Sequence, residues 1–248
     1  MSEPNPKHPV AQKAAPASDS RWSAERYPDY SNEVDQSIRF SGVGHDFFLK
    51  GKAEKLLALL DRFDFHPNGL DLLDIGCGVG LLHPFLEGTG LRITGVDVAD
   101  AALAEARALN KNASYFHYDG AHLPFPNARF DVALTICVLH HVPPDQWHAF
   151  LSEALRVIKS PGALIVFEHN PWNPLTRLAV NRCPFDHDAV LLSAPHLTTL
   201  MADAGFIQVA REYLFFTPFS HGVVRRLEAR VNRMPLGAQY VIMGRKHD

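Results

Sequence analysis

The sequence has few cysteines, no strong excess of one charge and no long hydrophobic run, and each deficit excludes a class of protein. Its 248 residues include three cysteines, Cys77, Cys137 and Cys183, and none belongs to a CxxC pair. An odd number of cysteines without such a pair argues against a disulfide framework and against a zinc site, and it is typical of a reducing compartment. The sequence therefore predicts a cytoplasmic protein with free thiols.

The charge balance and the hydrophobic pattern exclude two further classes. The 24 basic and 27 acidic residues give a formal net charge of −3, so no cationic field would draw the chain to nucleic acid or anionic lipid. The longest apolar stretch, near residues 132–142, is much shorter than the roughly 20 residues of a membrane-spanning helix, and the first residues contain no apolar signal core. We therefore expect a soluble protein with no nucleic-acid partner and no stable membrane insertion. The oligomeric state stays open.

The hydrophobic residues, 46% of the chain, are enough for one main α/β domain with a proper core. Residues 1–20 are rich in Pro, Ala and Ser and poor in large apolar side chains, which predicts a disordered tail. We expect one domain over residues 21–248. Its predicted parts are an N-terminal helical cap at 21–65, a cofactor-binding core at 66–170, a cover segment at 171–195 and the C-terminal strands at 196–248.

Short β-like runs alternate with helical patterns along the core. The predicted strands are 70–75, 91–97, 113–119, 129–136, 162–169, 206–216 and 238–245. The predicted helices are 44–65, 82–88, 101–110, 145–158 with Asp145 as its N-cap, and 196–204. Strands that alternate with helices indicate a parallel sheet covered on both faces, so the fold class is α/β with a doubly wound Rossmann-like sheet.

The stretch LLDIGCGVG, residues 72–80, places three glycines where the first predicted strand turns into the next element. In a doubly wound sheet the ligand lies beyond the carboxyl ends of the strands, and glycines let it approach the main chain. For the glycines alone, a turn without a ligand is the alternative. The next two strands end in Asp97, placed to bond both hydroxyls of a ribose, and in Asp119, placed to reach an adenine amino group.

Four stretches, LLDIGCGVG, ITGVDVAD, YFHYDGAHLPFPNARFDVALTICVLHHV and LRVIKSPGALIVFEHN, resemble the successive motifs of the class I S-adenosylmethionine-dependent methyltransferases over residues 70–170. The resemblance implies a seven-stranded sheet, mostly parallel with an antiparallel final strand, and S-adenosylmethionine as the cofactor. It also implies the cofactor-binding residues. These are Asp74, Gly76, Cys77 and Gly78 at the amino-acid part, Asp97 at the ribose, Val98, Asp119 and Gly120 at the adenine, and Cys137 in the pocket wall.

A dinucleotide, as in a dehydrogenase, is the rival cofactor. Its loop has the pattern G-x-G-x-x-G, whereas the third glycine here comes one residue early. Asp74, just before the loop, would repel a pyrophosphate and attract the ammonium of a methionine moiety. The charge argument therefore favours the sulfonium cofactor.

A hydroxyl acceptor benefits from a general base, and the predicted strand ends offer several. The catalytic candidates are His140 and His141 after residue 136, and Glu168 and His169 at the end of the following strand. His141 is the preferred candidate, and its alternatives are a role in shaping the cofactor pocket or in structure alone.

No metal site is predicted, because the strand that ends at residue 136 is followed by Cys137 and histidines rather than by a carboxylate. The run Asp186, His187 and Asp188 is a weaker candidate for a base or a metal pair, and such a run more often caps a helix.

The predicted activity is methyl transfer to a small-molecule or glycan acceptor, such as a metabolite or sugar, with oxygen as the favoured acceptor atom. The cover segment resembles that of bacterial methyltransferases acting on such acceptors. Two alternatives stay open: a C- or N-methyltransferase of a quinone-type intermediate, and a non-catalytic partner protein that binds S-adenosylmethionine. Tyr27, Tyr30 and Phe40 are expected to line the cleft or to anchor the N-terminal segment. The basic amphipathic stretch 221–233 allows a peripheral membrane contact.

Overall fold

The structure, a computed structural model, describes residues 30–217 and 230–247. The predicted tail, Tyr27 and most of the basic stretch 221–233 lie outside these ranges, as do the side chains of residues 30–33. Within the described ranges, no helix is both long and apolar enough to cross a bilayer.

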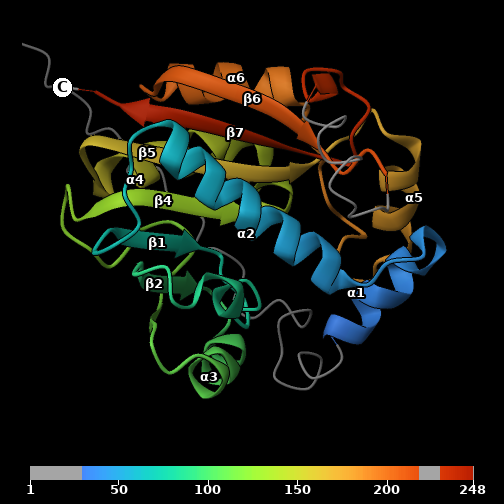
Figure 1. Cartoon of the computed structure of the whole chain (residues 1–248), viewed down its shortest axis with the longest axis horizontal. Helices are drawn as coiled ribbons and strands as arrows, with labels where there is room; N and C mark the ends of the chain where they lie inside the picture. The colour runs from blue at the N-terminus through green and yellow to red at the C-terminus, as the bar shows by residue number, and fades with distance from the viewer. Residues whose placement is uncertain (1–29, 218–229, 248) are drawn as a thin grey trace, which may run out of the picture.

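Seven strands form one sheet in the order β3-β2-β1-β4-β5-β7-β6. The strands are β1 (Asp71–Ile75), β2 (Arg92–Asp97), β3 (Ser114–His117), β4 (Phe130–Ile136), β5 (Ile158–His169), β6 (Ile207–Leu214) and β7 (Gln239–Lys246). The first five are parallel, and β7 runs antiparallel to both of its neighbours. The predicted doubly wound sheet with an antiparallel final strand is therefore confirmed (Figure 1).

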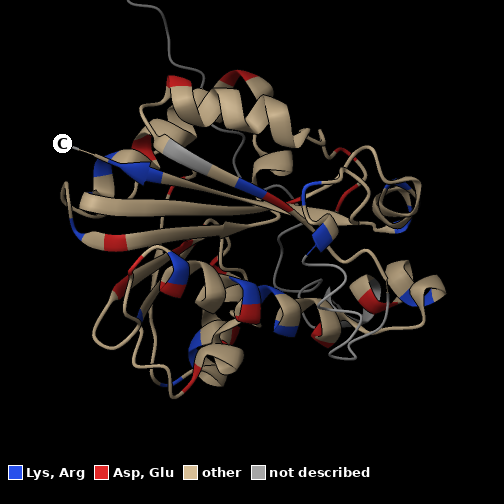
Figure 2. Ribbon diagram, turned by 45° about the horizontal axis from the view of Figure 1, so that its top comes forward, with Lys and Arg blue, Asp and Glu red and all other residues tan. Residues whose placement is uncertain are grey.

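Six α-helices accompany the sheet in the described ranges. They are α1 (Tyr30–Ile38), α2 (His45–Arg62), α3 (Asp100–Leu109), α4 (Trp147–Val157), α5 (Pro174–Arg182) and α6 (Ala194–Asp203). Alternate side chains of each buried strand point to opposite faces. Thus Leu73 of β1 packs with the core under α4 and α6, whereas Leu72 packs with the core under α2. In Figure 2 the charged residues lie mainly on the helices and at the strand ends, which leaves the middle of the sheet apolar.

Three local predictions were wrong. Asp145 does not cap α4: the helix starts at Trp147 after a 3₁₀ turn at Pro144–Gln146, and no side chain caps it. The predicted helix at 82–88 is only a 3₁₀ turn, His83–Leu86. Strand β5 begins at Ile158 rather than at the predicted residue 162, so the Lys-Ser-Pro-Gly sequence belongs to the strand.

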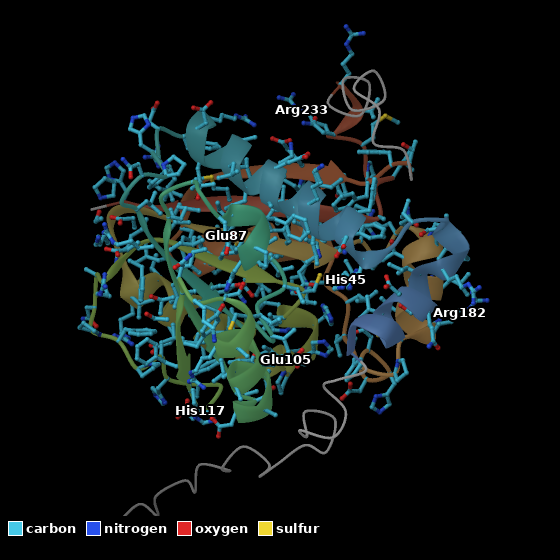
Figure 3. The ribbon with its side chains drawn as sticks, turned by 60° about the horizontal axis from the view of Figure 1, so that its bottom comes forward. His45, Glu87, Glu105, His117, Arg182 and Arg233 are labelled. Carbon is cyan, nitrogen blue, oxygen red and sulfur yellow. The ribbon has the colours of Figure 1, made fainter. Side chains whose placement is uncertain are left out.

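The cover segment is more ordered than its polar, proline-containing sequence indicates. It contains α5, whose N-cap Asn173 accepts hydrogen bonds from the amides of Leu175 and Thr176. Helices α1 and α5 contact each other and lie beyond the carboxyl ends of the parallel strands (Figure 1). Figure 3 shows His45, the first residue of α2, and Arg182, the last residue of α5, on this same side of the molecule. These elements enclose the space in which a doubly wound sheet holds its ligand.

Candidate functional site

A cavity of about 1930 Å³ lies at the carboxyl ends of the parallel strands. Loops that follow β1, β2, β3, β4 and β5 line it, together with α1, α2 and α5. Small-molecule pockets usually measure about 300–1,000 Å³. The cavity is therefore large enough for two ligands side by side.

The predicted cofactor residues and the three predicted catalytic histidines border this cavity, whereas the fourth catalytic candidate, Glu168, does not. The cofactor residues are Asp74, Gly76, Cys77, Gly78, Asp97, Val98, Asp119, Gly120 and Cys137, and the histidines are His140, His141 and His169. Phe40 borders it too, at the end of the N-terminal segment. The fold thus brings the ends of five strands to one space.

The glycine loop leaves room beside its backbone. Gly76 has φ of 75°, and a Cβ there would lie 2.5 Å from the side chain of Val138, so only glycine fits without a shift. Gly78 also has a positive φ, 53°, but a Cβ there would meet no atom within 4 Å. The open side of Gly78 faces space that a ligand can occupy against the main chain.

Asp74 carries an unsatisfied negative oxygen. Its side chain is buried, and Oδ2 lies 3.0 Å from Nε2 of His83, while Oδ1 has no hydrogen-bond partner. The other ring nitrogen of His83 bonds the hydroxyl of Tyr115, so the imidazole is held from both sides. His83 was not predicted from the sequence to belong to the site. A buried carboxylate oxygen without a donor favours a cationic ligand group.

Asp97 joins the end of β2 to the glycine loop. Its Oδ2 accepts a hydrogen bond from the amide of Gly78 over 2.8 Å, and its Oδ1 accepts one from the amide of Ala99 over 2.9 Å. Burial raises the pKa of this carboxyl, and the two backbone donors oppose the rise. Because each carboxylate oxygen has two lone pairs, both oxygens can accept a further bond from a ligand hydroxyl.

Asp119 is used differently from Asp97. Its Oδ1 accepts hydrogen bonds from the amides of Ala121 and His122, at 2.8 and 2.6 Å, and these donors lower the pKa of the carboxyl. Its side chain is 62% exposed. The carboxylate therefore mainly holds its own turn at the mouth of the cavity, next to Gly120 and the exposed side chain of Val98.

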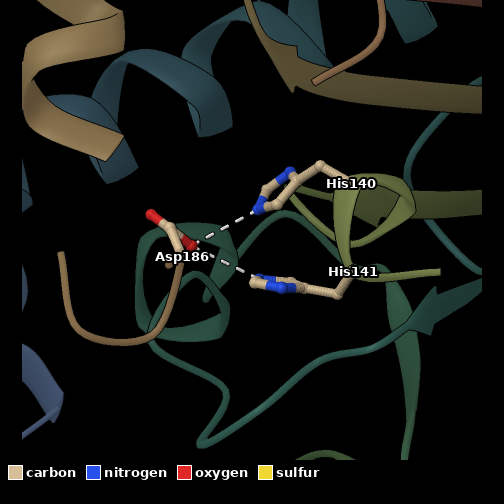
Figure 4. Close-up of side chains that lie close together, drawn as sticks. All are labelled: His140, His141 and Asp186. Atoms are coloured by element: carbon tan, nitrogen blue, oxygen red, sulfur yellow. Dashed lines mark ion pairs between the residues drawn. The ribbon is translucent and has the colours of Figure 1, made fainter. Parts of the chain in front are cut away.

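The two adjacent histidines converge with Asp186 at the same cavity. They lie in the 3₁₀ turn Leu139–His141 after β4. Nε2 of His140 lies 3.5 Å from Oδ1 of Asp186, and Nε2 of His141 lies 3.4 Å from the same oxygen (Figure 4). Nδ1 of His140 is 2.7 Å from Oε2 of Glu168, whose other oxygen accepts the amide of Leu139.

Burial and charge act in opposite directions on this cluster. Burial lowers the pKa of His141 to about 4, and the neighbouring His140 adds to the effect. Burial also opposes the charged form of His140, but the carboxylates of Glu168 and Asp186 outweigh it and raise the pKa. The same histidines hold the pKa of the buried Glu168 below its usual value despite desolvation.

Cys137 lies between this cluster and α2. It adopts a positive φ of 56°, and its Sγ lies 3.7 Å from Nζ of Lys52 and 3.9 Å from Nε2 of Gln239. Burial would raise the pKa of the thiol, but Lys52 and His169 outweigh it and hold the pKa below its usual value. Lys52 was not predicted to belong to the site. It lies in the buried stripe of α2 between Leu49 and Leu56, where a charged residue among apolar ones indicates a functional role.

Comparisons with known proteins identify relatives of this chain. A family model described as a methyltransferase domain matches residues 73–166. A probable S-adenosylmethionine-dependent methyltransferase of Mycobacterium tuberculosis is 30% identical over 177 residues, which cover 68% of this chain and 62% of that protein. A ubiquinone biosynthesis O-methyltransferase of Maricaulis maris is 32% identical over 118 residues, 45% of each chain.

A solved structure has the same fold. It is described as an S-adenosylmethionine-dependent methyltransferase of Thermotoga maritima, possibly a histamine N-methyltransferase. It superposes with a TM-score of 0.63 at 22% identity, over 90% of this chain and 97% of that one. The chain spans less than two thirds of the length of the two curated relatives.

Proposed function

Because the chain belongs to the class I S-adenosylmethionine-dependent methyltransferase family, we propose that it transfers a methyl group to a hydroxyl oxygen of a small acceptor. The observation that carries the proposal is that one cavity is bordered both by the Asp74 and Asp97 carboxylates and by the histidine pair.

The cofactor wall fits S-adenosylmethionine by charge and by space. The donor-free Oδ1 of Asp74 suits the ammonium of the methionine moiety, and the Asp97 carboxylate suits the ribose hydroxyls. The open side of Gly78 leaves room for the cofactor beside the backbone. When bound, the cofactor supplies a methyl group on a positively charged sulfur. A pyrophosphate would meet a buried negative charge at Asp74, which argues against a dinucleotide.

The acceptor part of the cavity has an apolar side and a polar side. Phe47 and Phe48 of α2 pack with Phe215 after β6, with ring centroids 5.0–5.9 Å apart. His141 and Asp186 lie on the same cavity. This combination suits an acceptor with a flat apolar body and a hydroxyl group.

His141 is the proposed base for that hydroxyl. It takes up the proton as the acceptor oxygen gains the methyl group, and Asp186, 3.4 Å from its Nε2, stabilises the imidazolium that forms. The protein otherwise contributes alignment and exclusion of water, which matter most in an in-line displacement.

A quinone-type intermediate is the second candidate acceptor, methylated at oxygen or at carbon. The aromatic side of the cavity supports it, and so does the similarity to a ubiquinone biosynthesis O-methyltransferase. A non-catalytic protein that binds the cofactor remains the rival from another class, and formation of a methylated product separates the two.

The test is methyl transfer from isotope-labelled S-adenosylmethionine to a panel of catechols, hydroquinones, sugars and amines, with the product identified by mass spectrometry. We expect an O-methylated product from a hydroxyl acceptor. His141→Gln should lower kcat by about 100- to 10,000-fold and leave affinity for S-adenosylhomocysteine within about twofold. The matched control is His148→Gln, an exposed histidine on α4.

A C- or N-methylated product would overturn the assignment to oxygen. Binding of the cofactor without transfer to any acceptor in the panel would favour the non-catalytic alternative.

A further inference from the structure

The spacing of the His140, His141 and Asp186 ligand atoms does not fit direct hydrogen bonding. Charge-assisted N–H···O bonds are about 2.7–2.9 Å long, whereas the two imidazole nitrogens lie 3.5 and 3.4 Å from Oδ1 of Asp186. Nitrogen and oxygen ligands about 2.0–2.2 Å from a tetrahedral cation lie about 3.3–3.6 Å from each other. We propose that these three side chains bind a divalent transition-metal ion of the zinc class.

One of the proposed ligand atoms, Nε2 of His140, has no hydrogen-bond partner, although the residue is only 1% exposed. Its other nitrogen, Nδ1, lies 2.7 Å from the carboxylate of Glu168. A carboxylate at Nδ1 fixes the tautomer that leaves the lone pair on Nε2, as outer-shell carboxylates do for metal-binding histidines. Figure 4 shows this nitrogen directed at Asp186.

The negative charges of the cluster also favour a bound cation. Glu168 is buried, with 1% of its side chain exposed, and Asp186 is partly buried, with 14% exposed. Buried charges are stable when they are paired or coordinate a metal. A divalent ion held by neutral imidazoles would cancel both charges.

The donor set selects the type of ion. Two imidazole nitrogens and one carboxylate oxygen suit zinc and its neighbours in the first transition row, whereas Mg²⁺ and Ca²⁺ prefer sites made of oxygen. All three ligand residues border the cavity, so the remaining coordination position is open to it. Three protein ligands with an open position is the arrangement of catalytic rather than structural zinc.

The third ligand comes from the cover segment, and the backbone holds it in place. The amide of Val190 donates to the carbonyl of His140 over 2.8 Å, and the amide of Asp186 donates to the carbonyl of Cys183 over 3.0 Å. The sequence predicts no metal site because no carboxylate follows β4 directly. Asp186 supplies that carboxylate from a segment that is distant in sequence.

The role of the ion rests on the proposed function, although its binding does not. An acceptor hydroxyl at the open position would become more acidic and release its proton to water. Its oxygen would then take the methyl group while the electron pair of the breaking bond stays on sulfur. In that case His141 acts as a ligand, and the ion takes over its part in deprotonation.

Calorimetry with Zn²⁺ alone, on the full chain freed of metal with a chelator, tests the proposal. We expect one ion per chain, with no comparable binding of Mg²⁺. Asp186→Asn and His140→Ala should each weaken binding at least 100-fold, and Glu168→Gln should weaken it about 10- to 100-fold. The matched control is His187→Ala, which removes an adjacent histidine that is 67% exposed and should leave binding unchanged.

Equal Zn²⁺ affinity in the wild type and in the Asp186→Asn and His140→Ala variants would overturn the proposal, and so would no binding by the wild type. Wild-type protein loaded with Co²⁺ gives a readout that does not depend on the folding of any variant. Nitrogen and oxygen ligands give weak visible bands. An intense thiolate charge-transfer band would show that a cysteine binds the ion, and this would overturn the assignment.

Binding of S-adenosylhomocysteine, measured on the same preparation, separates the two proposals. Zn²⁺ binding without S-adenosylhomocysteine binding would support the metal site and contradict the proposed function. The reverse pattern would support the cofactor assignment and overturn the metal site.

Discussion

The carboxylate of Asp97 accepts the amide of Gly78 over 2.8 Å, so the end of β2 holds the glycine loop in place as well as facing the cavity. Asp97 therefore both positions the glycine loop and borders the ligand cavity, and a substitution should affect both roles. Loss of the carboxylate frees the amides of Gly78 and Ala99 and removes the acceptor for the ribose hydroxyls.

Asp97→Ala should therefore weaken binding of S-adenosylhomocysteine. Hydrogen bonds to a charged group contribute about 1.5–3 kcal/mol, which corresponds to a loss of about 10- to 150-fold in affinity. Calorimetry on folded protein checks this, with the exposed Asp203→Ala on α6 as the matched control. If the affinity of Asp97→Ala equalled that of the control, the ribose would have to be held elsewhere.

Gly78→Ala separates a backbone effect from a ligand effect. A Cβ at φ of 53° costs about 1–2 kcal/mol of stability, and it would project into open space at the cavity. We expect affinity for S-adenosylhomocysteine to fall at least about tenfold. Gly88→Ala is the matched control, because Gly88 also has a positive φ, 75°, with no atom within 4 Å of the added Cβ, but does not line the cavity. Equal affinities in the two variants would contradict a ligand beside Gly78.

Cys137 should be the first cysteine to react with iodoacetamide. Lys52 and His169 hold its pKa below the usual value against the effect of burial, whereas burial raises the pKa of Cys77 and raises that of Cys183 to about 12. Peptide mass mapping after limited labelling identifies the site. Lys52→Met should slow the labelling of Cys137 several-fold, and S-adenosylhomocysteine should protect the thiol because it borders the cavity. Earlier labelling of Cys77 or Cys183 would contradict this assignment.

The carboxylate of Asp71, at the other end of the sheet, should make the free energy of unfolding depend on pH. Hydrogen bonds from Arg92 above all, and then from Lys159 and Arg129, lower the pKa of its carboxyl against desolvation. Since the pKa is lower in the folded than in the unfolded state, the stabilisation is complete above about pH 3.9 and is lost as the pH falls through the folded-state pKa.

Asp71→Asn should lower the free energy of unfolding at pH 7 by about 1–2 kcal/mol, because its partners are partly exposed. Urea unfolding of both proteins at pH 7 and below pH 3 measures the difference, which should shrink in acid. A difference that stays constant or grows in acid would rule out the carboxylate as its cause.

The sheet could be predicted because its signals are local. The predicted strands at 70–75, 91–97 and 129–136 correspond within one residue at each end to β1, β2 and β4. Buried strands have apolar runs bounded by turn residues, and those runs are visible in the sequence. The 3₁₀ turn at His83–Leu86 has the same apolar spacing as a helix, so its short length was not visible.

The site was only partly predictable for the same reason. The glycine loop and Asp97 carry their own motif, so they were found together. The contacts of Asp186 with His140, and of Lys52 with Cys137, join segments far apart in the chain. No local pattern specifies such contacts, although a lysine in the apolar stripe of α2 was a usable sign.

The central claim is that the cavity at the strand ends holds S-adenosylmethionine between Asp74, the glycine loop and Asp97. Calorimetric titration of the wild-type chain with S-adenosylhomocysteine, and separately with NAD⁺, tests it most directly. The account predicts one saturable site for S-adenosylhomocysteine, displaced by S-adenosylmethionine, and no measurable heat with NAD⁺. Saturable binding of NAD⁺ without binding of S-adenosylhomocysteine would contradict it.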